Sequence, residues 1–230
     1  MANNFLAKGS VWRKWDLQIH TPKTKLADQY RTSDGTDVWD RFVDYLKKSD
    51  VSIFGITDYF SIDGYVKLLE KTKGNKDFKD RVFFPNIEFR LDISTNTDSE
   101  EINIHLIFDN KCKIEDIKTF LSKLETANTK SNGSHYHCTP EDLSSLGYDK
   151  ACISLDKLKK ALKETFGNDK PYLIVGASNG NGGIRANTQS PRKMGLSDEV
   201  DKDCDFFFGR KQDQEYFLKT DRYEDKTIKA

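Results

Sequence analysis

The sequence predicts an α/β protein with a mostly parallel sheet or barrel and helices outside it. Short apolar runs alternate with segments of helical periodicity along the 230 residues. Most of these runs are continuous rather than alternating, as expected of strands that are buried on both faces. No internal repeat or clear linker divides the chain. In folds of this class the functional side chains gather at the carboxyl ends of the strands.

The first half of the chain is predicted to alternate strands and helices. In order, these are a strand at 15–20 (WDLQIH), a helix at 37–48, a strand at 51–57, a helix opened by Ser61 and a strand at 81–89. Ser33 or Thr36 is the expected N-cap of the first helix, because short hydroxyl side chains accept hydrogen bonds from free helical N–H groups. Pro85 predicts an interruption or an end of the last strand, because proline lacks a ladder donor.

The second half continues with a strictly alternating strand at 102–108 and a helix at 113–124. The polar stretch from about 126 to 150 is predicted to be a long loop with one short helix at 140–146. A helix at 154–166 with Ser154 as its N-cap, a strand in YLIVGAS and a short strand at 204–209 follow. We expect one domain over 1–219 and a charged tail over 220–230.

Composition excludes several classes of protein. The 37 basic and 37 acidic residues balance, which argues against a broad basic surface for nucleic acid. No apolar run approaches the roughly 18 residues of a membrane span, and the N-terminus lacks the apolar core of a signal peptide. The four cysteines show no CxxC spacing. We interpret them as reduced thiols and expect a cytoplasmic protein.

Four predicted strands each carry one side chain that can bind a metal. His20 ends the first strand, Asp58 and Glu88 end the next two, and His105 lies within the fourth. Each residue alone is more typical of a hydrogen-bonded core or turn residue. Their recurrence on successive strands indicates a metal or catalytic cleft, and a mixture of imidazole and carboxylate favours Zn²⁺, Mn²⁺ or Fe over Mg²⁺.

Two other segments are weaker candidates. SHYHC places His135, His137 and Cys138 together, which suits a metal but also fits an ordinary polar loop. SNGNGG at 178–183 offers backbone amides for a phosphate, with Arg185 as a clamp, although it matches neither GxGxxG nor the Walker pattern. A plain loop is the better interpretation of this second segment.

The strand-end segments together resemble the PHP (polymerase and histidinol phosphatase) superfamily. WDLQIHTP, GITDYFSIDGY, PNIEFRL and INIHLIF are similar to its first four motifs. The longer form GSVWRKWDLQIHTP, with DYFSIDGY and IEFRL, resembles the PHP-like N-terminal module of large bacterial ATPases of the AAA or SMC type, some of them linked to phage defence. The resemblance runs from Gly9 to about Phe108.

This resemblance implies an irregular (βα)₇ barrel that holds a cluster of up to three divalent metals at the strand carboxyl ends. It implies hydrolysis of phosphomonoesters or phosphodiesters, including nucleic-acid ends. The residues that match metal-binding positions are His20, Glu88 and His105, with Asp58 as a further oxygen ligand. The side chains proposed to hold phosphate are Lys23, Arg90 and Arg185.

The sequence also departs from the superfamily pattern. Gln18 stands where the first motif has its first histidine, and Tyr59 stands where the second motif has one. The last motif, Asp-x-His, is absent, and the chain stops about where it would begin. The chain is then a fragment truncated before that motif or a natural short form. In either case the metal site is depleted, with one ion or none.

Two functions stay open on this basis. One is a metal-dependent phosphoesterase or nuclease module that works with an AAA/SMC-type ATPase in nucleic-acid processing or phage defence. The other is a catalytically inactive PHP-like scaffold that binds a partner protein or nucleic acid. A third reading is a structural α/β domain whose strand-end acids and histidines are only hydrogen-bonded.

Overall fold

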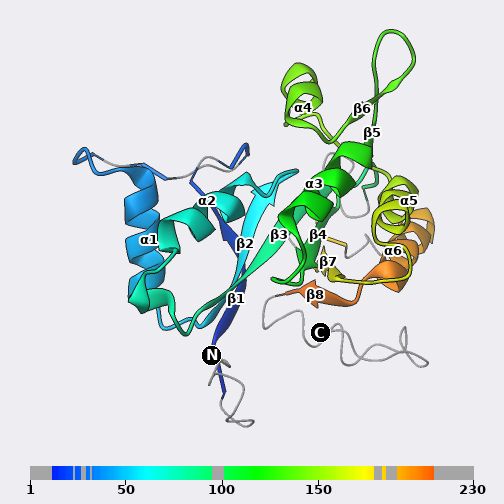
Figure 1. Ribbon diagram of the computed structural model, residues 1–230. Helices are drawn as coiled ribbons and strands as arrows, with labels where there is room; N and C mark the ends of the chain where they lie inside the picture. The colour runs from blue at the N-terminus through cyan, green and yellow to red at the C-terminus, as the bar shows by residue number, and fades with distance from the viewer. Residues whose placement is uncertain are drawn as a thin grey trace.

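The computed structural model describes residues 12–22, 24–26, 30–31, 33–94, 101–178, 183–184 and 191–209, without the side chains of 191–194. The chain has an α/β fold around a curled sheet with strand order β1-β2-β3-β4-β7-β8 (Figure 1). The sheet strands are β1 (Trp15–His20), β2 (Ile53–Tyr59), β3 (Val82–Arg90), β4 (Asn103–Phe108), β7 (Tyr172–Ala177) and β8 (Phe206–Phe208). The prediction of a mostly parallel sheet is confirmed, since five of these strands run one way and only β4 is reversed. A complete (βα)₇ barrel stays a prediction.

Six α-helices lie in the described part of the chain. They are α1 (Val38–Lys48), α2 (Asp63–Thr72), α3 (Ile114–Lys123), α4 (Pro140–Leu146), α5 (Leu155–Phe166) and α6 (Pro191–Asp203). Figure 1 shows α1 and α2 beside β1–β3, and α5 and α6 near β7 and β8. No helix among the described residues is both long and apolar enough to span a membrane.

The core is rich in aromatic side chains from both halves of the chain. Phe42, Phe54, Phe89, Phe108 and Phe120 are all fully buried. Phe89 contacts Phe120 edge to face, with ring centroids 6.3 Å apart, so β3 and α3 share one apolar layer. Burial of an aromatic side chain contributes about 1.5–3 kcal/mol, so these contacts hold the sheet rigid beneath the polar residues at its carboxyl edge.

The helix ends show which cap predictions hold. Ser154 caps α5 as predicted, and its Oγ accepts a hydrogen bond from the Lys157 amide. The N-cap of α1 is Asp37 rather than Ser33 or Thr36, and its carboxylate accepts from the amides of Trp39 and Asp40. An aspartate suits this place because it meets both the free N–H groups and the positive end of the helix dipole.

Pro85 does not interrupt its strand. β3 is continuous, and Pro85 pairs with Ile56 of β2, whereas pairing with the antiparallel β4 begins only at Asn86. Pro85 therefore lies where one neighbouring strand is missing, and its lack of an N–H costs no bond to β4.

The predicted long loop at 126–150 contains more structure than expected. The short helix at 140–146 is confirmed as α4, but a hairpin of β5 (Glu125–Thr129) and β6 (His135–His137) precedes it. Gly133 takes a φ of 82° at the tip, a conformation that glycine adopts at little cost. The strands are short and polar, so hydrophobic periodicity did not reveal them. Helix α6 was also missed.

Candidate functional site

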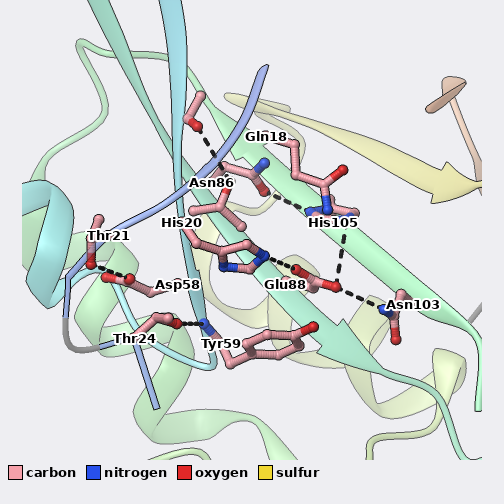
Figure 2. Close-up of polar contacts among 12 residues, drawn as sticks. Gln18, His20, Thr21, Thr24, Asp58, Tyr59, Asn86, Glu88, Asn103 and His105 are labelled. Atoms are coloured by element: carbon pink, nitrogen blue, oxygen red, sulfur yellow. Dashed lines mark hydrogen bonds and ion pairs between the residues drawn. The ribbon is translucent and has the colours of Figure 1, made fainter. Parts of the chain in front are cut away.

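The carboxyl edge of the sheet brings together three of the four predicted ligands. His20 ends β1, and Glu88 lies near the end of β3, two parallel strands away. β4 runs antiparallel to β3 and sets His105 directly opposite Glu88 in the register. Figure 2 shows the two imidazoles on either side of the Glu88 carboxylate. We call His20, Glu88 and His105 the histidine–glutamate cluster.

The cluster is compact and mostly buried. His20 Nε2 lies 3.2 Å from Glu88 Oε2, and His105 Nε2 lies 3.9 Å from Glu88 Oε1. The side chains of Glu88 and His105 are each 1% exposed, whereas that of His20 is 23% exposed. Asn103 Nδ2 donates to Glu88 Oε1 at 2.8 Å. A solvent-borne group would therefore reach the cluster on the His20 side.

The charges inside the cluster depend on each other. Burial alone would raise the pKa of Glu88, but the neighbouring His20 and His105 override it and hold that pKa below its usual value. Burial lowers the pKa of His105 to about 4. At neutral pH the cluster thus contains an ionised carboxylate beside a neutral imidazole, which are the protonation states that a bound metal needs.

Several polar atoms of the cluster have no hydrogen-bond partner among the described residues. They are His20 Nδ1, Glu88 Oε2 and His105 Nε2, and all are buried. The 3.2 Å approach of His20 to Glu88 is close enough for an ion pair, but Oε2 still lacks a hydrogen bond of acceptable geometry. Buried polar atoms without partners cost about 1–3 kcal/mol each, so the cluster has unused binding capacity.

Asp58 is placed differently from the other predicted ligands. Its Oδ1 accepts from Thr21 Oγ1 at 2.6 Å, and its Oδ2 accepts from the Gly64 amide at 2.8 Å. The N-cap residue of α2, Ile62, makes no side-chain cap bond, so Asp58 serves the start of that helix instead. Burial raises the pKa of Asp58 to about 6, against the opposing effect of these two hydrogen bonds. Each Asp58 oxygen thus already accepts one hydrogen bond, which leaves it less capacity for a metal than Glu88 Oε2 has.

Tyr59 and Arg90 complete the rim of the cluster. The Tyr59 ring stacks on His20, with centroids 5.3 Å apart and an interplanar angle of 12°. Burial and the nearby Glu88 carboxylate raise the pKa of the Tyr59 phenol well above its usual value, so it stays protonated. The Arg90 guanidinium lies 5.7 Å from the Tyr59 ring centroid and donates to the Asp149 carbonyl. This contact occupies one of its five N–H donors.

Gln18 lies next to a bulge in β1. Pairing with β2 passes from Asp16↔Phe54 to Ile19↔Ile56, so three steps along β1 match two along β2. The Gln18 side chain is exposed, and Figure 2 shows it extending toward the His105 end of the cluster. The bulge changes the simple alternation of faces that the sequence predicted for this strand.

A cavity of about 200 Å³ adjoins the Asp58 side of the site. Thr21, Asp58 and Tyr59 line it together with two lysines, Lys25 and Lys67. Lysine ammonium groups suit phosphate as point charges. The sequence analysis did not single out either lysine, because nothing in the local pattern distinguishes them from other surface lysines.

The remaining predicted residues are not part of this site. In the hairpin, His135 Nδ1 and His137 Nδ1 lie 3.2 and 2.9 Å from the carbonyls of Asn128 and Ser122, and Cys138 is buried. These contacts favour a structural role. Lys23, Arg185 and most of SNGNGG lie outside the described residues. Within the described ranges, no three His, Cys, Asp or Glu side chains form a ready-made metal site.

Two asparagines that contact the cluster were missed by the sequence analysis. Asn86 and Asn103 each stand two residues before a cluster member, in the matching segments NIE and NIH. Residues two apart share one face of a strand, so each asparagine lies beside the cluster. This repeated spacing was the available signal.

Comparison with known proteins finds similarity only at the level of solved structures. No family model and no curated protein matches the sequence. Among solved structures, a candidate metal-dependent phosphoesterase from Bifidobacterium adolescentis aligns with a TM-score of 0.48 and 10% identity, over 90% of this chain and 82% of the other. At 10% identity, any assignment of activity depends on the residues of this chain.

Proposed function

We propose that the chain is a PHP-like module that binds one divalent metal in the histidine–glutamate cluster and acts as a phosphoesterase. The observation that carries this proposal is that Glu88 Oε2 and His105 Nε2 are buried and have no hydrogen-bond partner among the described residues. A cation between the ionised Glu88 carboxylate and the neutral His105 imidazole would satisfy Glu88 Oε2 and His105 Nε2 and neutralise the buried charge.

The spacing of the cluster agrees with this proposal. Ligands bound to one ion at about 2.0–2.2 Å lie roughly 3–3.5 Å from each other. The 3.2 Å separation of His20 from Glu88 fits that range, and the 3.9 Å separation of His105 from Glu88 needs a small inward movement. In their present positions the described residues form no ready-made site. The donor set suits Mn²⁺, Zn²⁺ or Fe.

The rim residues support a phosphate ester as the substrate. A bound divalent metal would lower the pKa of a water and neutralise phosphoryl charge. Arg90 has donors left for a phosphate oxygen, and Lys25 and Lys67 line the adjoining cavity. Lys23 and Arg185 stay candidates for the same task. The partial exposure of His20 leaves a path for the substrate.

We further propose, from the sequence resemblance alone, that this module works in the cytoplasm with an AAA/SMC-type ATPase, in nucleic-acid processing or phage defence. A short, balanced-charge chain offers no broad surface for nucleic acid. Contact with DNA or RNA ends would then be local, at the cluster. Co-purification of this chain with an AAA/SMC-type ATPase from the same cells tests this part.

The decisive experiment measures metal binding and hydrolysis on the same protein. Metal-stripped protein is titrated with Mn²⁺ and Zn²⁺ by calorimetry, and then assayed on a p-nitrophenyl phosphodiester. We expect binding and turnover that His20→Ala and His105→Ala both remove, and that the hairpin control His137→Ala preserves. If the protein binds no metal and neither the wild type nor any variant hydrolyses the ester, the result would instead support the inactive scaffold. Gln18 in the first motif favours that alternative.

A further inference from the structure

Asn86 is fully buried on β3 and contacts the two strands that carry the histidines of the proposed metal site. Its side chain reaches Leu17 on β1 and His105 on β4. We propose that Asn86 is a positioning residue that fixes the ring tautomer of His105 and anchors the β1 bulge that leads into His20. The proposal deepens the proposed metal site and rests on it for its functional meaning.

The orientation of the Asn86 amide follows from its partner on β1. Asn86 Nδ2 donates to the Leu17 carbonyl oxygen at 2.8 Å. A backbone carbonyl only accepts, so the opposite orientation of the amide would bring two oxygens together. The NH₂ group therefore faces Leu17, and Oδ1 faces His105 Nδ1 at 3.2 Å.

This orientation decides where His105 carries its proton. Since Asn86 Oδ1 can only accept, His105 Nδ1 must donate, and in the neutral ring Nε2 then holds a lone pair. Nε2 is the atom 3.9 Å from Glu88 Oε1, too far for a hydrogen bond. Without Asn86, the carboxylate would draw the proton to Nε2 and block the nitrogen that faces the cluster.

The second contact of Asn86 holds β1 in its bulged path. A Cβ on Gly55 of β2 would collide with the Leu17 carbonyl group, so the glycine makes room for that carbonyl. Asn86, on the far side of β2, can then donate to Leu17 O across a separation of 69 residues. The bulge brings the strand to His20 three residues later. One amide thus positions two proposed ligands from different strands, as outer-shell residues of metal sites do.

Nitrogen NMR of the histidine rings in metal-free protein at neutral pH tests this assignment. We expect His105 in the Nδ1–H form in the wild type and in the Nε2–H form in Asn86→Leu. Asn86→Asp keeps an acceptor for His105 and should retain Nδ1–H. Both variants lose the donor to Leu17, so the amide signal of Gln18 should shift in both. Asn132→Leu, which removes an exposed asparagine in the turn between β5 and β6, should leave the His105 tautomer unchanged.

Metal titration of the same variants supplies the functional readout. Asn86→Leu should weaken metal binding by about 10–100-fold, as removal of outer-shell partners does, and Asn86→Asp should recover part of this loss. The assignment is overturned if the wild type holds Nε2–H, or if Asn86→Leu keeps Nδ1–H. A switch of tautomer in the control Asn132→Leu overturns it as well. Correct tautomers in a protein that binds no metal would contradict the proposed function and leave the orienting role of Asn86 standing.

Discussion

Glu88 and Asp58 are two buried carboxylates at the same edge of one sheet, 1% and 4% exposed, yet their surroundings differ. Asp58 has a donor for each oxygen, from Thr21 and Gly64, and it supports the start of α2. Glu88 lies between two imidazoles, and no group in the described part of the chain hydrogen-bonds its Oε2. Burial therefore does not identify a metal ligand. The number of donors already committed to the carboxylate separates a structural acid from one that is free to bind.

The largest expected effect separates these two acids by metal affinity. Glu88→Gln removes the charge at the centre of the cluster and should weaken Mn²⁺ or Zn²⁺ binding by more than about 100-fold, beyond the range seen for outer-shell changes. Asp58→Asn is the matched control and should change the affinity only slightly. Calorimetric titration of both variants measures the difference. Equal losses would show that Asp58 is also a ligand.

The pH dependence of stability should also distinguish Asp58. Its folded-state pKa of about 6 lies above the ordinary value of 3.8, so the folded protein binds the proton more tightly. Its contribution to stability is therefore largest at low pH, and falls as pH rises from about 4 to 6, by on the order of 3 kcal/mol. Denaturant unfolding of the wild type and Asp58→Asn across this window should show the slope only in the wild type. If the free energy of unfolding changes with pH in the same way in both proteins, the assigned role of Asp58 is contradicted.

The close packing of α2 on Asp58 predicts a further stability effect. A Cβ at Gly64 would collide with Thr21 Oγ1 and Asp58 Oδ2, so Gly64→Ala should destabilise the fold by about 1–3 kcal/mol. Gly195 in α6 has open space around its Cβ position, and Gly195→Ala should be neutral or stabilising by up to about 1 kcal/mol. Thermal unfolding compares the two. If Gly64→Ala unfolds at the same temperature as the wild type, the start of α2 is loosely packed.

The smallest expected effect is a gain at Gln18. Imidazole binds transition metals better than an amide oxygen, so Gln18→His should raise metal affinity by about 10-fold if the side chain reaches the cluster. Glu88→Gln combined with Gln18→His is the control, because the gain requires an intact carboxylate. Unchanged affinity in the single variant would show that the bulge holds residue 18 too far away.

Much of the sheet was predictable from local pattern. Apolar runs and helical stripes located every strand of the sheet and five of the six described helices. Chain order at the strand ends predicted one group of His20, Asp58, Glu88 and His105, and in the structure both histidines lie beside Glu88. The hairpin of β5 and β6 escaped because its short polar strands lack an apolar face. The predicted interruption at Pro85 was wrong, because a proline fits within a strand wherever the neighbouring strand does not need its N–H. Here pairing with β4 begins only after Pro85.

The sequence by itself determined the α/β class and the residue types at the carboxyl edge, because strand periodicity and side-chain chemistry are local properties. The tertiary structure decided which of those residues have free lone pairs. Asp58 Oδ1 accepts a hydrogen bond from Thr21, 37 residues away, and the His105 tautomer depends on Asn86, which Leu17 orients from 69 residues away. Such partners meet only when distant strands pair, so no local pattern encodes them.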